Sequence, residues 1–590
     1  MKLVWSPLKG RILSGKLRIS VKASGIICVL GDKRRIFRLL EKRLTKIYSR
    51  KWVQIAFLLG FCFVLYFFNL GRWDLWNPDE PRYAQIAREM VNGGDWILMH
   101  FNGGVYGDKP PLFFWLIALS SYLWQGFTSF SVRFPSAFFG TLTVLLTFFQ
   151  GERLYSSRTG FFSGLILATS LHFAHLSTRA NIDVTLTFCT TASLLCFFLW
   201  YPYGQKEGIH HNRTIRNLLI YGFYVSMAFA TLAKGPIGFI LPLLVSLIYL
   251  LIQKDYKEIK RMKLLPGIPL LLAIVLAWYL PAVFLGGKTY LEENLLRHTT
   301  EAYGTGWTHP RPLYYYFYNF PLSFFPWTFF LPAAIVYGCS KMTIEKRKGF
   351  LFLLVWCLVI FTFFSLSKSK RALYLLPLYP AASLMVGKFW SDFISHPLDQ
   401  FRRGWITFPL YGFIGLGVIA GAATPWVASI KFPSYLSYSL PIALLLFGGS
   451  MVMMIFCRYK NYRAILFLLI GMMVAGYFYA FRVIFPLANP QMSARFISEE
   501  ITSRIQPGEK LAIYGGLGTD PYNYYTGVVP IIKFDNREAF LDFIGSSERV
   551  FCLLKFRDFS RLFNSEGEPK VQLIARRKVR NDDVVLISNR

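Results

Sequence analysis

The stretch Trp73-Asp-Leu-Trp-Asn-Pro-Asp-Glu-Pro-Arg-Tyr-Ala-Gln-Ile-Ala-Arg88 follows directly on an uncharged apolar run over residues 52–70. Two adjacent carboxylates, Asp79 and Glu80, therefore lie just beyond a predicted membrane helix, with Arg82 two residues further on. Charged groups are costly near hydrocarbon, and where they cluster they usually mark a pathway or a site. We therefore predict a functional site just beyond the end of the first span.

The composition is that of a polytopic membrane protein. The chain has 590 residues, 54% of them hydrophobic and 18% aromatic, and each span uses about 20 apolar residues. The net charge of +33 does not indicate a nucleic-acid partner, because the basic residues fall in short loops between apolar runs. A phosphate-bearing substrate remains compatible with this excess. The cysteines show neither metal-ligand spacing nor a disulfide framework.

The basic loops set the predicted topology. Residues 1–51 carry 15 Lys and Arg and no run long enough to span, so we expect a cytoplasmic extension. Its residues 33–51 are typical of a basic amphipathic helix on the inner membrane surface. If the later basic loops are also cytoplasmic, the chain has about 13 spans and its C-terminus lies outside. The expected spans are 52–70, 132–150, 160–177, 183–201, 216–233, 236–252, 264–285, 320–340, 349–366, 372–389, 405–429, 437–457 and 462–483.

This topology divides the chain into a transmembrane domain, residues 52–485, and a tail, residues 490–590. Within the first, residues 71–131 form one outer loop with interfacial helices, because the apolar segment 110–124 is too short to span. The tail alternates short apolar runs with turns and charges, which predicts a soluble α/β domain on the outer side. We expect helices at 493–504 and 538–544 and strands at 510–514, 528–533, 550–554, 571–575 and 584–588.

Several charged residues fall together on the outer face of this topology. They are Asp79, Asp108, Lys109, Asp183, Lys234, Arg297 and Lys370. Lysine and arginine side chains suit the oxygens of a lipid phosphate and stabilise charge on a departing phosphate. A carboxylate among them deprotonates or orients an incoming nucleophile. Asp108 and His298 are weak candidates for a divalent metal site, since no ligand spacing supports one.

The same residues carry a family resemblance. Trp76-Asn-Pro-Asp-Glu-Pro-Arg-Tyr-Ala84, followed by Gly94-Asp-Trp96, His100-Phe101 and Lys109-Pro110, is similar to the first outer loop of bacterial 4-amino-4-deoxy-L-arabinose transferases. Lys234-Gly, Asn294-Leu-Leu-Arg297 and residues 367–374 continue the similarity, which covers roughly residues 52–390. That family belongs to the C-type glycosyltransferases, together with the protein O-mannosyltransferases.

The resemblance implies inverting transfer of a sugar, of the aminoarabinose kind, from undecaprenyl phosphate to lipid A or another envelope glycolipid. The reaction would take place at the periplasmic face of the bacterial inner membrane. Asp79 and Asp183 match catalytic carboxylates of the family, and Arg82, Lys109, Arg297 and Lys370 would contact the donor phosphate. Glu80, Tyr83, Asp108, Lys234 and Tyr374 are further candidate site residues.

Three departures leave the sugar and the acceptor open. Asp108 stands where the family tends to have Glu, Pro110-Pro111 replaces a single proline, and Ser367-Lys-Ser-Lys-Arg371 is more basic than the family pattern. Transfer to protein Ser or Thr is therefore an alternative, and a lipid or ion transporter is a more distant one. A structural role also stays open for Asp79, Glu80 and Asp183, as carboxylates in the first turns of helices.

Overall fold

The computed structural model describes residues 50–201, 212–292, 310–341, 344–395, 400–563 and 570–590. The chain divides into two compact units, Met1–Phe57 and Leu58–Arg590. Of the first unit, the described part is the beginning of helix α2 (Lys51–Cys62). The predicted cytoplasmic extension and its amphipathic helix at 33–51 therefore lie almost entirely outside the described residues.

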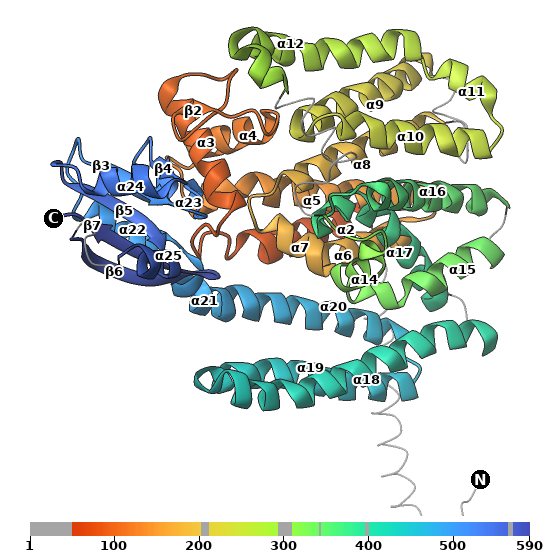
Figure 1. The fold of residues 1–590 in the computed structure, drawn as a ribbon. Coiled ribbons are helices and arrows are strands. Elements are labelled where there is room, and N and C mark those ends of the chain that lie inside the picture. The colour runs from red at the N-terminus through yellow and green to blue at the C-terminus, as the bar shows by residue number, and fades with distance from the viewer. Residues whose placement is uncertain (1–49, 202–211, 293–309, 342–343, 396–399, 564–569) are drawn as a thin grey trace, which may run out of the picture. The chain divides into compact units, whose positions relative to one another are not determined.

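The second unit is mainly helical. Nine helices in the described part are long and apolar enough to cross a membrane, and ten if the bent pair Tyr315–Ser323 and Trp327–Ser340 is one span. The longest elements in chain order are α5 (Ser129–Leu154), α8 (Ile182–Trp200), α9 (Arg213–Lys234), α12 (Leu264–Leu291), α16 (Ile344–Leu366), α17 (Tyr379–Ser395), α18 (Gln400–Lys431), α19 (Leu436–Arg458) and α20 (Tyr462–Tyr479). Figure 1 shows many of them running roughly side by side.

Every expected span has a helix at its position, but several are shorter or broken. The expected span at 52–70 is helix α2 with its π-helical continuation η1 (Phe63–Phe67). The expected span at 236–252 is helix α10 (Ile237–Ile252). Both are shorter than the ~20 residues of an ordinary span. The expected span at 160–177 is two helices, α6 (Ser157–Thr169) and α7 (Leu171–Ser177). It is broken at Ser170, and the next amide, of Leu171, donates to the Phe325 carbonyl instead of to its own helix. The expected span at 320–340 is bent by 118°.

Shorter elements complete this part of the chain. They are α11 (Tyr256–Arg261), α14 (Tyr315–Ser323), η3 (Trp327–Phe329), α15 (Leu331–Lys341), η4 (Ala372–Leu378), η5 (Pro433–Tyr435), η6 (Ala480–Ile484) and α21 (Phe485–Met492).

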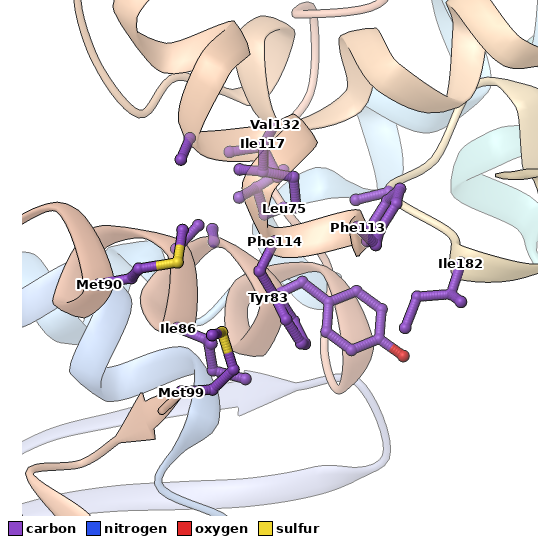
Figure 2. Packing of buried hydrophobic residues seen from close by; sticks show 14 residues of the cluster. Leu75, Tyr83, Ile86, Met90, Met99, Phe113, Phe114, Ile117, Val132 and Ile182 are labelled. Carbon is purple, nitrogen blue, oxygen red and sulfur yellow. The ribbon is translucent and has the colours of Figure 1, made fainter. Parts of the chain in front are cut away.

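The segment of residues 71–131 contains two helices, and their predicted interfacial position stays a prediction. Helix α3 (Asp79–Gly93) and helix α4 (Leu112–Leu123) flank a small hairpin of β1 (His100–Phe101) and β2 (Gly104–Val105). Gly94 ends α3 in the left-handed conformation, φ 72°, which glycine adopts without steric cost. A buried cluster joins α3 to α4, with Met90, Phe113, Phe114 and Ile117 among its members (Figure 2).

The tail forms the predicted α/β domain. Its sheet has the strand order β4-β3-β5-β7-β6, with β4 and β5 parallel to β3 and with β7 antiparallel to β5 and β6. The strands are β3 (Lys510–Tyr514), β4 (Ile532–Phe534), β5 (Val550–Lys555), β6 (Gln572–Val579) and β7 (Asp582–Ser588). Strand β4 begins later than predicted, because residues 528–531 include Pro530, which has no N–H for a ladder bond.

Helices cover both faces of this sheet. Alternate residues of β5 point to opposite faces, so Phe551 and Leu553 pack with α22 (Arg495–Thr502) and α23 (Asp520–Thr526). Val550, Cys552 and Leu554 pack with α24 (Arg537–Ile544) and α25 (Phe556–Leu562). The sequence predicts α22 and α24, whereas α23 and α25 have seven residues each and no clear apolar period.

The crossing of α5 and α6 depends on a glycine. A Cβ at Gly160 would overlap the carbonyl oxygen of Phe148, so the two helices approach through their backbones, as small residues allow in membranes. We expect Gly160→Ala to lower the free energy of unfolding by about 1–3 kcal/mol through overpacking. Thermal unfolding of the detergent-purified protein measures this. Gly415→Ala is the control, because a Cβ there meets nothing within 4 Å, and an equal loss in both variants would contradict the interpretation.

Candidate functional site

A buried carboxylate organises the approach to the site. Glu80 is 1% exposed and accepts two hydrogen bonds from the fully buried guanidinium of Arg133, at 2.7 and 3.0 Å. Arg179 donates a third bond at 2.9 Å, and the backbone amides of Trp76 and Ala180 add two more. Burial alone would raise the pKa of Glu80, but the two arginines hold it well below its usual range. Glu80 is therefore a structural anchor.

Asp79 points to a different partner. Arg371, just before η4, donates from Nη2 to Asp79 Oδ2 at 3.0 Å, and both side chains keep partial solvent access. The carboxylate begins α3, and the neighbouring Glu80 holds the start of this helix against α5. Asp79 is thus a partly solvent-accessible carboxylate at the start of a helix whose position is fixed. It forms an ion pair with Arg371 and remains accessible to a ligand.

Asp183 and Lys234 form a second ion pair. Asp183 lies in the first turn of α8, and its Oδ1 accepts a hydrogen bond from the ammonium of Lys234 at the end of α9. The same ammonium lies 4.3 Å from the centre of the Tyr374 ring. The structure therefore brings three predicted site residues, Asp183, Lys234 and Tyr374, into one cluster.

Arg82 binds a residue of the C-terminal domain. Its Nε donates to Asp520 Oδ1 at the start of α23. Burial lowers the pKa of Arg82, but the bond to Asp520 outweighs it and the net pKa lies above the usual value. Arg88, further along α3, donates to the carbonyls of Asn523 and Tyr524 at 3.0 and 2.8 Å. The tail is therefore tied directly to the helix that carries Asp79.

Asp108 and Lys109 form a local pair in the loop before α4. Lys109 Nζ lies 3.1 Å from Asp108 Oδ1, and Tyr106 donates its hydroxyl to Asp108 Oδ2 at 3.0 Å. Burial, followed by the charge of Asp108, raises the pKa of Tyr106 well above its usual value.

The Tyr83 hydroxyl lies near several of the charged groups described above. Its ring packs edge-on against Phe113 and Phe114, and its hydroxyl lies on the side of Ile182 (Figure 2). Burial raises the pKa of this hydroxyl, and the charges of Asp79, Asp108 and Asp183 raise it further while Arg371 opposes them. The charges of three carboxylates, which come from three separate segments, therefore all affect the pKa of the Tyr83 hydroxyl.

Lys370 lies differently from the prediction. Its ammonium donates to the carbonyl of Arg311 at 3.1 Å and to that of Ser367, and the residue is buried. The neighbouring Arg371, not Lys370, contacts Asp79. Arg297 and His298 lie outside the described residues. Within the described residues, no group of three or more His, Cys, Asp or Glu is arranged to hold a metal ion.

Sequence reasoning missed Arg133 and Asp520 altogether. It included Arg371 only as part of the basic segment 367–371 and did not select Arg179 as a site residue. Arg133 carries a signal, because an arginine in the first turn of an apolar span needs a buried partner. Asp520 has no such signal, since nothing in the sequence of residues 518–522 indicates a contact with α3. Together, the described groups can hold an anionic ligand beside a carboxylate, as a phosphate-releasing transfer requires.

The chain is similar to known proteins over most of its length. Residues 52–291 match the family model described as dolichyl-phosphate-mannose-protein mannosyltransferase. Over 91% of this chain and 98% of the neighbour, the fold matches the crystal structure of ArnT from Cupriavidus metallidurans bound to undecaprenyl phosphate, with a TM-score of 0.77 and 20% identity. The fold and site define a multi-pass membrane glycosyltransferase of the C type.

Curated relatives give the family. An undecaprenyl phosphate-α-4-amino-4-deoxy-L-arabinose arabinosyl transferase of Aeromonas hydrophila is 30% identical over 411 residues, 68% of this chain and 70% of that protein. A Pseudomonas fluorescens protein of the same name is 31% identical over 396 residues, 66% of this chain and 67% of that protein. A protein of Aquifex aeolicus is 31% identical over 327 residues, 55% of this chain and 62% of that protein. The chain belongs to the arabinosyl transferase family.

The Glu80 cluster gives a stability prediction. Removing one partner of a buried pair leaves an uncompensated charge, so we expect Glu80→Ala to cost about 3–5 kcal/mol of unfolding free energy at neutral pH. The folded pKa lies below the usual glutamate value of 4.5, so the contribution is complete above about pH 4.5 and is lost as the pH falls through the folded pKa. Thermal unfolding at pH 7 measures the first effect, and a series continued from pH 4.5 to more acidic pH measures the second.

The control is Glu500→Ala, which removes a more exposed pair with Arg504 four residues away and should cost less than about 1 kcal/mol. Equal losses in the two variants would show that the Glu80 cluster is no anchor.

Proposed function

We propose that this protein transfers an aminoarabinose-type sugar from undecaprenyl phosphate to lipid A at the periplasmic face of the bacterial inner membrane. The single observation that carries this is the Asp79 carboxylate, which is held by Arg371 and also interacts with the charge of Arg82. Lys234, which is paired with Asp183, interacts with the charges of Lys109 and Arg371 in the same region. The names of the Aeromonas and Pseudomonas relatives support the sugar and the polyprenyl carrier.

The reaction exchanges one bond at the anomeric carbon. A phosphate or hydroxyl oxygen of the acceptor attacks this carbon from the face opposite the carrier, and the bond between carbon and the carrier's phosphate oxygen breaks. The configuration inverts, and undecaprenyl phosphate leaves with the bonding electron pair. If the nucleophile is a hydroxyl, Asp79 takes its proton; if it is a phosphate oxygen, Asp79 orients the acceptor.

The cations serve the departing phosphate. Arg82 and Lys109 lie on the same outer loop as Asp79 and can stabilise the charge that develops as the carrier leaves. Arg297, which follows α12 in the sequence, is assigned to the same phosphate from the family resemblance alone. The Asp183–Lys234 pair has a carboxylate and an ammonium beside Tyr374, and we assign it to orienting the sugar.

The orientation follows the positive-inside trend. We place residues 1–51 in the cytoplasm, and residues 490–590 in the periplasm as a separate domain beside the site. The bond from Asp520 to Arg82 supports this placement, because both residues must then lie on the face where the reaction occurs.

Asp79→Asn tests the reaction. We expect turnover to fall by about 10²–10⁴-fold, because the amide neither accepts a proton nor carries charge. Mass spectrometry of lipid A from cells expressing wild type or variant detects the added sugar. Asp95→Asn is the control, since Asp95 accepts hydrogen bonds from the amides of Ile97 and Leu98, which an asparagine oxygen can also accept.

Full activity of Asp79→Asn would refute the catalytic role. A sugar found on envelope proteins instead of lipid A would favour transfer to Ser or Thr, the reaction named by the matching family model.

Arg82→Gln tests the donor contact. We expect the KM for the undecaprenyl-phosphate donor to rise about tenfold, the size of one charge-assisted hydrogen bond. The exposed Arg72 of the same segment provides the control variant Arg72→Gln. If Asp520→Asn reproduces the whole effect of Arg82→Gln, Arg82 acts by docking the C-terminal domain and not by binding the donor.

A further inference from the structure

A second cationic pocket lies beside the site. It has a volume of about 520 Å³ and is formed where the segment after α16 meets the segment before α14. Among the described residues that line it, none carries a carboxylate. The lining includes three cations, Arg311, Lys368 and Lys370, and two serines, Ser365 and Ser367. Such a lining is suited to an anion.

The pocket is built by backbone contacts between the two segments. Pro310 and Ser369 form an antiparallel bridge, and the Arg311 amide donates to the Lys368 carbonyl at 3.2 Å. The buried ammonium of Lys370 donates to the carbonyls of Arg311 and Ser367, one on each segment. Lys370 therefore joins the two walls, and the side chains of Arg311 and Lys368 remain exposed.

One polar group in this pocket points to a ligand. Ser365 is 7% exposed and lines the cavity, and its hydroxyl has no hydrogen-bond partner among the described residues. Buried hydroxyls without a partner are costly and uncommon in folded proteins. The hydroxyl oxygen is itself buried, so rotation of the side chain into the pocket would let it donate to a phosphate oxygen there.

The rim indicates that the anion belongs to a lipid. Leu313 and Leu366, which also line the pocket, are 62% and 67% exposed. Leu366 is the last residue of α16, one of the apolar helices long enough to span, so the pocket opens where that span ends. Exposed leucines next to lysine and arginine suit a ligand with both an acyl region and an anionic headgroup.

The pocket adjoins the reaction centre. Lys370 precedes Arg371, whose guanidinium contacts Asp79, and the Arg371 carbonyl accepts a hydrogen bond from Tyr316 at 3.1 Å. We propose that this pocket binds a phosphate group of the acceptor lipid and so presents the acceptor to Asp79; this rests on the function proposed above. It assigns Lys370 to the acceptor phosphate in place of the donor phosphate that the sequence predicts.

Binding of an acceptor phosphate would explain why the segment Ser367-Lys-Ser-Lys-Arg371 is so basic. The donor phosphate is assigned to Arg82 and Lys109, which come from the loop of residues 71–131. An acceptor with its own phosphate needs a separate set of cations, because two phosphates on one set would repel each other.

Steady-state kinetics with purified protein in phospholipid vesicles test the pocket. The substrates are the undecaprenyl-phosphate-linked sugar and lipid A with two phosphates. For Lys368→Gln we expect the KM for lipid A to rise about tenfold while the KM for the donor is unchanged. Lys288→Gln is the matched control, because Lys288 is an 87% exposed lysine paired with Glu292 and lies away from the pocket lining.

Kinetics with lipid A that lacks one phosphate show whether the pocket recognises that phosphate or another part of the lipid. If the pocket binds the missing phosphate, wild type and Lys368→Gln have the same KM for this lipid. If inorganic phosphate competes with lipid A in the wild type as strongly as lipid A itself binds, the pocket is a free-phosphate site and the proposal is wrong. A rise in the donor KM, or no change in either KM, also overturns it.

Binding is measured separately, so that failure of the reaction and failure of the pocket are distinguished. Native mass spectrometry counts lipid A molecules bound to wild type, Lys368→Gln and Ser365→Ala. Weaker binding in the variants without any turnover by the wild type would keep the pocket and reject the proposed transfer. Equal binding by all three proteins would reject the pocket even if transfer proceeds.

Discussion

The Glu80 carboxylate, buried between two arginines, is the interaction on which the rest of the site depends. Its partners come from the start of α5 and from the turn before α8, and Arg133 also donates to the backbone carbonyls of Leu70, Trp73 and Asp74. One buried charge network therefore joins the end of the first helix, the beginning of α3 and the ends of two long helices. A buried charge is tolerated only with such complete pairing, and this pairing fixes the direction in which Asp79 points.

The C-terminal domain is part of the same arrangement. Helix α23 contributes Asp520 to Arg82, and Tyr524 and Tyr525 donate their hydroxyls to the carbonyls of Phe127 and Leu75. Asn102, in the hairpin after α3, exchanges hydrogen bonds with Ile531 and Asn523. These contacts reach the loop of residues 71–131 at several points, so the domain supports the loop that carries Asp79.

The three carboxylates also differ in their partners. Glu80 is saturated by arginines and is structural, Asp79 has one arginine and some solvent access, and Asp183 is paired with a lysine beside an aromatic ring. Adjacent carboxylates in the sequence thus have different roles because α3 turns successive side chains by about 100°. Glu80 faces inward to the long helices, and Asp79 faces the convergence point around Tyr83.

The sequence by itself determined the helical membrane class, the positions of most long helices and the α/β tail, whereas the site roles of Asp79, Asp183, Lys109 and Lys234 stay predictions. Apolar run length, period-two alternation and clustered charges are local signals, which can be read from the sequence without knowledge of packing. Only the tertiary structure decided which charges pair. Arg371 lies 292 residues from Asp79, and Asp520 lies 438 residues from Arg82. No periodic pattern connects positions so far apart, because their contact is set by how helices and domains pack; the same packing turned Lys370 toward backbone carbonyls and Arg371 toward the site.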